Sequence, residues 1–219
     1  MENKKALVWL RDDFRVNHNS ALVYASENHE QVSTVYIFNP EEYENKREAQ
    51  RWWIYHSLIN FKHELSKYNI SLELLVGKEV EALKKIKAND KISLYWNKIP
   101  EPDEENKEKK ILKNLEEKNI HYKFFKGNIL SEYKEVTKDD GTPFKVFTPF
   151  WRTAEQVYLN KAPSRESKLK KKNKKIFIFK ESDDLKKVLP NKNWFNKFEK
   201  YWNPSEINSD KVLKNLIDK

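Results

Sequence analysis

The stretch KALVWLRDDFRVNHNSAL, residues 5–22, decides the fold class, because an apolar run passes directly into a loop dense with charges. Lys5–Trp9 is strand-like, and residues 11–19 contain two arginines, two aspartates and two asparagines. In parallel sheets such loops lie at the carboxyl edge, where ligands bind. Local physics leaves two interpretations open. In the functional interpretation, the guanidinium groups of the loop bind an anionic or heteroaromatic ligand. In the simpler one, the charged side chains of the loop form salt bridges with one another and Asn19 caps the next helix.

Strand-like and helix-like segments alternate over the first 125 residues. The expected strands are Lys5–Trp9, Val32–Phe38, Leu72–Val76, Ile92–Trp96 and His121–Phe125, and the expected helices include Arg51–Lys67, Val80–Ile86 and Asp103–Glu117. Apolar residues recur at three- and four-residue spacing in the helices. This order predicts an α/β fold, a doubly wound five-stranded parallel sheet with helices on both faces.

The pattern changes after about residue 130. We expect an α/β domain over residues 1–130, a long irregular linker over 131–200, and the start of a helical segment over 201–219. Thr153–Leu159 has the length of one or two helical turns, and the basic run Lys168–Lys175 is interpreted as a solvated linker, with phosphate contact as the alternative. Ile207–Ile217 has apolar residues at helical spacing and needs a partner surface, either on the first domain or outside this chain.

Composition excludes several classes of site. The 219 residues contain no cysteine, which excludes thiolate metal sites. They contain only three glycines, and these do not form a glycine-rich phosphate loop of the Rossmann or Walker type. The five histidines show no ligand spacing, and we expect no metal site. Apolar runs such as Leu72–Val76 are too short to span a membrane. We expect a cytoplasmic protein, whose net charge of +9 reflects a lysine-rich surface more simply than a nucleic-acid footprint.

A second charged segment follows the fourth expected strand. In YWNKIPEPDEENKEKK, residues 95–110, the acids Glu101, Asp103 and Glu104 lie at the strand end and the start of a helix. Acids in a first helical turn complement the helix dipole, which is the simpler interpretation. The functional alternative is that these carboxylates accept hydrogen bonds from a pterin-like or flavin-like ring.

Five segments, in order along the chain, resemble motifs of the cryptochrome/photolyase family. They are WLRDDFRVNHNSAL (9–22), VYIFNP (35–40), YWNKIPEPDEENKEKK (95–110), TKDDGTPFKVFTPFWR (137–152) and YWNPSE (201–206). The sequence departs from the family pattern at four places. His18 replaces an aspartate, Pro100 an aromatic residue, Lys107-Glu108 an Arg-Asp pair, and Ser205 a glycine.

The resemblance implies the front portion of a DNA photolyase, which repairs pyrimidine dimers with light. Such a chain comprises an antenna domain, a linker and the first helix of an all-helical FAD domain that is otherwise missing. The chain would pass excitation to FAD and be catalytically inactive alone, so no catalytic residue is assigned. Whether to call it an enzyme stays open, with deoxyribodipyrimidine photolyase favoured by family. Its partners would be the helical FAD domain and, through the full-length protein, damaged DNA. The C-terminal helix could also mediate self-association.

The resemblance also suggests an antenna site. Asp103 and Glu104 match positions that contact methenyltetrahydrofolate in folate-antenna members. Arg11 and Asn39 lie at strand ends within reach of an 8-hydroxy-5-deazaflavin or flavin antenna, and Glu101 belongs to the matching Glu-Pro motif. FAD itself is not expected to bind this chain. Two other functions stay open, a stand-alone α/β module that binds a nucleotide-like ligand or a partner, and a fragment of a cryptochrome-type photosensor.

Overall fold

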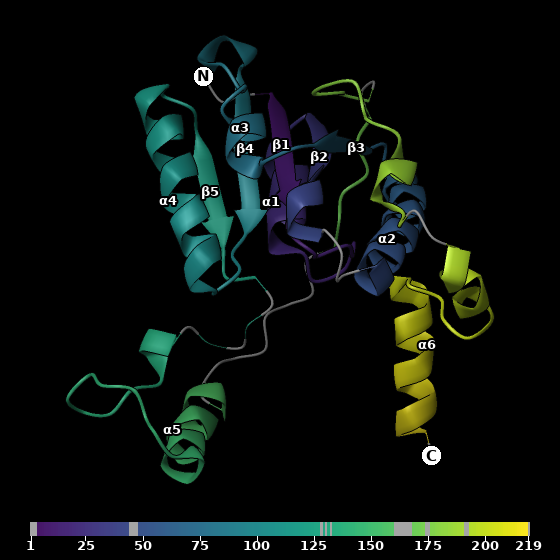
Figure 1. Cartoon of the computed structure of the whole chain (residues 1–219). Coiled ribbons are helices and arrows are strands. Elements are labelled where there is room, and N and C mark those ends of the chain that lie inside the picture. Colours follow the sequence, from purple (N-terminus) through teal and green to yellow (C-terminus); the bar gives the residue numbers. More distant parts are fainter. Residues whose placement is uncertain are drawn as a thin grey trace.

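The computed structural model describes residues 4–43, 48–127, 129, 131, 133–159, 168–173, 176–190 and 193–218. Five strands form one parallel sheet in the order β3-β2-β1-β4-β5 (Figure 1). The strands are β1 (Lys5–Leu10), β2 (Gln31–Phe38), β3 (Ser71–Val76), β4 (Ile92–Asn97) and β5 (Tyr122–Phe125). The predicted α/β fold with a five-stranded parallel sheet is therefore confirmed.

Helices cover both faces of the sheet. These are α1 (Ser20–Asn28), α2 (Glu48–Ser66), α3 (Glu79–Leu83) and α4 (Pro102–Glu117). Two further helices, α5 (Phe147–Leu159) and α6 (Glu206–Ile217), do not cover the sheet (Figure 1). In β1, Val8 packs in the core beneath α1 and α2, whereas Leu7 and Trp9 pack in the core beneath α3 and α4. Successive strand residues point to opposite faces, and β1 is apolar from Ala6 to Leu10 because both of its faces are buried there.

The carboxyl ends of β1 and β4 form the switch point of the sheet. From β1 the chain adds β2 and β3 on one side, then crosses to add β4 and β5 on the other. Trp9 of β1 therefore lies in register with Val35 of β2 and with Trp96 of β4. Ligands of such sheets bind outside the carboxyl ends of the strands, near this reversal.

Part of the segment that the sequence predicts to be a linker packs against the α/β sheet and its helices. Leu169 and Lys172 are buried, and the Lys172 ammonium donates hydrogen bonds to the backbone oxygens of Ser26 and His29. The prediction of a solvated basic run is wrong for these two residues. A lysine buries its stem when local carbonyl oxygens can accept from its head group, and that arrangement cannot be recognised in the run itself.

The edge strand β3 is covered by residues of the same linker. Glu73 accepts hydrogen bonds from the backbone N–H groups of Phe179 (2.9 Å) and Lys180 (2.8 Å). The Asp183 N–H donates to the Leu74 oxygen at 2.8 Å. Unpaired edges invite pairing with other chains, so this cover protects the sheet.

The last two helices lie on the side of the sheet at which the strands end (Figure 1). α5 begins at Phe147, six residues before the predicted turns at Thr153, and Ser205 caps α6 by accepting from the Asn208 N–H at 3.2 Å. The apolar residues of α6 stay exposed, for example Leu216 at 72%. Of the two partner surfaces that the sequence leaves open, the first domain does not cover this face.

Candidate ligand cavity at the carboxyl edge of the sheet

A cavity of about 370 Å³ opens where β1 and β2 end and where α3 and α4 begin. Four of the five residues predicted from the sequence line it, namely Arg11, Asn39, Glu101 and Glu104. Asp103, which is exposed on the first turn of α4, does not line it. Apolar and aromatic residues such as Trp9 and Ile37 complete the wall.

The Arg11 guanidinium is held by two carboxylates of α4. It donates to Glu104 at 2.6 Å and also to Glu108, and it lies 4.6 Å from the centre of the Trp9 ring. The side chain is 3% exposed. The salt-bridged interpretation of this loop therefore matches the geometry, and Arg11 does not offer a free fork to a ligand.

Glu108 is a residue of the site that is not among those predicted from the sequence. Its buried carboxylate accepts from Arg11 and from the Trp96 indole N–H at 3.1 Å. The signal lay in the helical period, since Glu108 shares a face of α4 with the buried residues Ile111 and Leu115. A carboxylate on a buried helix face requires a cation nearby.

Lys107 gathers three carboxylates at the rim of the cavity. Its ammonium lies 2.7 Å from Glu42, 2.8 Å from Glu104 and 3.6 Å from Glu79. Desolvation alone would raise the pKa of Glu104, but hydrogen bonds from Lys107 and Arg11 outweigh it and lower that pKa. The pKa of Glu79 is raised, mainly by desolvation. The rim therefore combines one firmly ionised carboxylate with another that resists ionisation.

Asp12 and Tyr36 form the polar floor beside this rim. Desolvation raises the pKa of Asp12, and the negative charges of Asp13 and Glu104 raise it further, against a hydrogen bond from Tyr36. Desolvation also raises the pKa of Tyr36 well above its usual value. Asp12 adopts a left-handed backbone conformation, with φ of 60°, which is uncommon outside glycine.

The switch point itself is filled by a buried polar network. The Asn97 amide donates to Asp13 at 2.5 Å and to Asn19 at 2.9 Å. Asn19 also accepts from the Leu22 N–H at 3.1 Å, so it is the N-cap of α1 as the sequence predicts. These side chains fix the loop after β1, and with it the position of Arg11 and Asp12.

A second, larger cavity of about 650 Å³ lies between this loop, α2 and the start of α6. Glu206 joins two of these elements, accepting from the N–H groups of Val16 (2.7 Å) and Asn17 (3.0 Å). None of the five predicted residues lines this cavity. Across the described residues no group of histidines and carboxylates could hold a metal ion, and no helix is long and apolar enough to cross a bilayer.

The smaller cavity has the size and polar groups to bind a small organic molecule. The described residues that line it include no nucleophile paired with a general base. Carboxylates, the Asn39 amide and two tyrosine hydroxyls surround an apolar wall. The accessible surface of the cavity is mainly polar, with a smaller apolar part, so it suits a ligand that presents hydrogen-bonding groups along its edge. Carboxylate oxygens accept hydrogen bonds, so they suit a ring with an N–H edge.

Comparison with known proteins gives a consistent family. The family model described as DNA photolyase matches residues 6–171. A deoxyribodipyrimidine photo-lyase of Agrobacterium fabrum is 29% identical over the whole chain, which corresponds to 46% of that protein. Cryptochrome-2 of Arabidopsis thaliana is 29% identical over 68% of this chain and 25% of its own.

Solved structures match as well. A bacterial class III photolyase from Agrobacterium tumefaciens superposes with a TM-score of 0.84 and 26% identity, covering 100% of this chain and 45% of that one. An archaeal photolyase from Sulfolobus tokodaii, described with two FAD molecules, shares the fold at a TM-score of 0.64 and 20% identity, over 84% of this chain and 40% of its own. The chain thus spans less than half of the length of these relatives.

Proposed function

Because this chain belongs to the DNA photolyase family, we propose that it is the light-harvesting part of a photolyase that repairs pyrimidine dimers in DNA. The cavity at the ends of β1 and β2 holds the antenna chromophore. The observation that supports this proposal is the convergence of Arg11, Asn39, Glu101 and Glu104 on that one cavity. Its wall of aromatic and aliphatic residues suits a flat ring, and its polar groups suit the ring's edge.

The protein contributes positioning rather than chemistry. A bound chromophore absorbs a photon and passes the excitation to FAD, and no covalent bond changes in the antenna. The chain's own residues exclude water from one face of the ring and fix its orientation through hydrogen bonds. Tyr43 and Ile99, which are half-buried in the lining, supply the apolar contact, while Asn39 and Tyr36 supply polar groups at the edge.

FAD and the DNA lesion belong to the proposed partner, the helical part of the family's proteins. The described residues contain one α/β sheet, and four of the predicted residues line the cavity at the ends of β1 and β2, whereas a neighbouring cavity of about 240 Å³ has only Arg11 and Glu101 in its lining. Extrusion of a lesion requires a closed pocket beside the flavin. We therefore assign to this chain the antenna role alone.

Repair is favoured over photosensing by the sequence identity of the relatives. The photo-lyase of Agrobacterium fabrum is 29% identical over 100% of this chain, whereas cryptochrome-1 of Arabidopsis thaliana, which aligns over 97% of it, is 25% identical, so the support comes from identity and not from coverage. A stand-alone binding module is the remaining alternative, and it would use the same cavity for a ligand that does not absorb near-ultraviolet or blue light.

Reconstitution tests the proposal. The chain is purified under dim light and incubated with methenyltetrahydrofolate, 8-hydroxy-5-deazaflavin or riboflavin, and the absorption of the protein peak is recorded after gel filtration. We expect one chromophore to co-elute with the wild type, to bind weakly to Glu104→Gln, and to bind normally to Asp103→Asn, the neighbour outside the cavity lining. Circular dichroism verifies that both variants are folded. Failure of all three chromophores to bind the wild type would overturn the proposal.

A further inference from the structure

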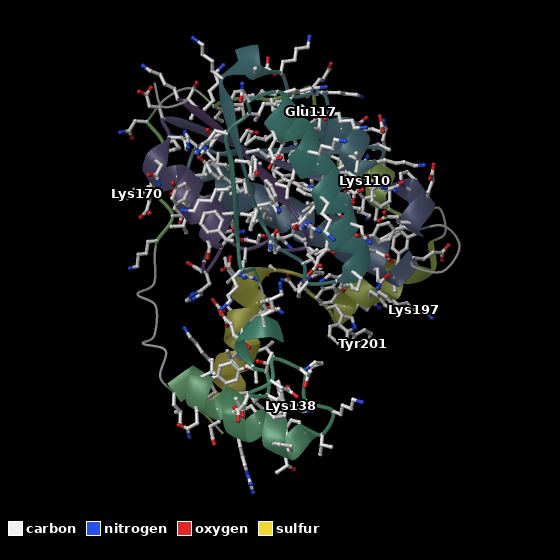
Figure 2. All side chains as sticks on the ribbon, turned by 90° about the vertical axis from the view of Figure 1, so that its left-hand side faces the viewer. Lys110, Glu117, Lys138, Lys170, Lys197 and Tyr201 are labelled. Atoms are coloured by element: carbon white, nitrogen blue, oxygen red, sulfur yellow. The ribbon has the colours of Figure 1, made fainter. Side chains whose placement is uncertain are left out.

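Helix α6 is joined to the α/β sheet and its helices near its first turn. None of its residues is buried, and in both views it points away from the sheet (Figure 1, Figure 2). Among the described residues, the hydrogen bonds that make this link come from Glu206 and from the preceding Pro204, whose carbonyl oxygen accepts from the Asn60 amide at 3.0 Å. The direction of α6 therefore depends on few contacts.

The Glu206 carboxylate binds two successive backbone groups of the loop after β1. One of its oxygens accepts from the Val16 N–H at 2.7 Å, and the other accepts from the Asn17 N–H at 3.0 Å. Hydrogen bonds to a charged acceptor are stronger than those between neutral groups. Because each oxygen takes its own donor, the pair fixes the orientation of the carboxylate as well as its position.

Two cavities flank this attachment. One of about 650 Å³ and one of about 330 Å³ lie beside it, and Phe14, Ser205 and Glu206 line both. Apolar packing restrains a helix only where side chains fill the space against it. The rings of Trp53 and Trp202 meet edge to face at 5.9 Å near this point, but these residues are 44% and 56% exposed. The two hydrogen bonds of Glu206 are therefore the main restraint on the direction of α6.

The loop that Glu206 binds also forms part of the cavity at the ends of β1 and β2. Arg11 and Asp12 line that cavity, and Asp12 also lines the larger cavity beside α6. Within the loop, the Asp13 carboxylate accepts from the Arg11 N–H at 2.9 Å, and the Asp13 backbone oxygen accepts from the Asn19 amide at 3.1 Å. Satisfied polar networks of this kind are rigid, so α6 and the cavity share one support.

We infer that Glu206 is a positioning residue, which holds α6 on the loop after β1 and so sets the direction of this helix relative to the chromophore cavity. The inference rests on the proposed function, because transfer of excitation by dipole coupling depends on the distance and the relative orientation of the two chromophores. Residues 201–206 resemble the motif that opens the helical part of the family's proteins. The direction of α6 then decides how that part faces the chromophore.

Amide hydrogen exchange tests the contact itself. Glu206→Ala removes both acceptors, so the Val16 and Asn17 amides should exchange at least about tenfold faster than in the wild type. Asp210→Ala removes another carboxylate of the same helix, which is exposed and also lines the larger cavity, and should leave both rates unchanged. Two-dimensional NMR measures the two rates separately, and circular dichroism verifies that both variants are folded.

A distance measurement tests the positioning. Because the chain has no cysteine, Lys110→Cys on the exposed side of α4 (Figure 2) and Asn215→Cys on α6 provide one pair of spin labels. Double electron–electron resonance then gives the distribution of distances between them. Glu206→Ala should widen this distribution at least about twofold, and Asp210→Ala should not change it. The midpoint of urea unfolding should be the same in both variants, since α6 buries no residue.

The outcomes separate the inference from the proposed function. An unchanged distance distribution in Glu206→Ala overturns the inference, and so does equal widening in Asp210→Ala. Slow exchange of the Val16 and Asn17 amides in Glu206→Ala also overturns it. None of these results affects the proposed function, which the reconstitution with chromophores tests. If that reconstitution fails, the role of Glu206 in excitation transfer falls with the proposed function, even if α6 is held as described.

Discussion

The guanidinium of Arg11 lies between the carboxylates of Glu104 and Glu108 and against the ring of Trp9. The sequence places this arginine at a strand end but does not reveal its partners, which lie more than 90 residues away in α4. The sequence therefore predicts where the site lies, but not which charged side chains pair with one another there. The ion pairs at the cavity can be identified only once the packing of α4 against the sheet is known.

Substitution of Glu108 should lower the free energy of unfolding. The change Glu108→Ala leaves Arg11 and the Trp96 N–H in the core without one of their acceptors. Loss of one partner of a buried ion pair costs about 3 kcal/mol of the free energy of unfolding. Urea denaturation measures this value. Glu81→Gln, whose pair with Lys84 is exposed, serves as the control and should change it by less than about 0.5 kcal/mol. A cost for Glu108→Ala as small as that of the control would contradict the buried pair.

Asp12 should oppose folding at neutral pH. Its folded pKa lies above the unfolded value of about 4, so the folded state holds a proton that the unfolded state releases, and stability falls as the pH rises through this window. Asp12→Asn should therefore stabilise the chain by an amount that grows between pH 4 and pH 7. The side chain reaches solvent, so the gain should stay below about 1 kcal/mol. Urea denaturation of both proteins at the two pH values checks the sign, and a gain that shrinks toward pH 7 would refute it.

At the scale of elements, alternation predicts all five strands and helical period predicts α2, α3 and α4, whereas α1 is indicated only by its capping residue Asn19. Apolar periodicity depends on residues that are close in sequence, which is why it can be recognised. The linker is different. Glu73 binds the backbone of residues 179 and 180 across more than 100 residues, and Arg51 donates to the backbone oxygens of Val188 (2.8 Å) and Leu189 (2.5 Å). Such contacts depend on the tertiary fold, so the sequence predicted a linker without its attachment.

The attachment of the linker to β3 should be breakable by one substitution. Glu73→Ala leaves the N–H groups of Phe179 and Lys180 and the hydroxyl of Ser33 without their acceptor. We expect a loss of about 2 kcal/mol and faster trypsin cleavage after Lys180, because the segment detaches more often. Limited proteolysis followed by mass spectrometry measures the rate. Glu117→Ala, an exposed change on α4, should leave it unaltered, and an unaltered rate in Glu73→Ala would show that the carboxylate does not hold the linker.

At the scale of the whole molecule, we expect the apolar residues of α6 to contribute little to the free energy of unfolding. None of its residues is buried, and Leu216 and Ile217 are 72% and 71% exposed. The double change Leu216→Asp/Ile217→Asp should therefore alter the free energy of unfolding by less than about 0.5 kcal/mol. Leu58→Ala in the core should cost about 2–5 kcal/mol in the same urea experiment. A loss above 1 kcal/mol in the double variant would show that α6 packs on the sheet.

The most direct test of the account concerns the cavity itself. Gln50 lies on the exposed side of α2 and lines the cavity, so Gln50→Trp should fill it without removing a buried contact, whereas Ala49→Trp adds the same ring one residue away, outside the lining. Equilibrium binding of the reconstituting chromophore should be saturable at one site in the wild type and in Ala49→Trp, and at least about tenfold weaker in Gln50→Trp. Equal affinity in all three proteins would show that the chromophore, if it binds, lies elsewhere, and the central claim would be wrong.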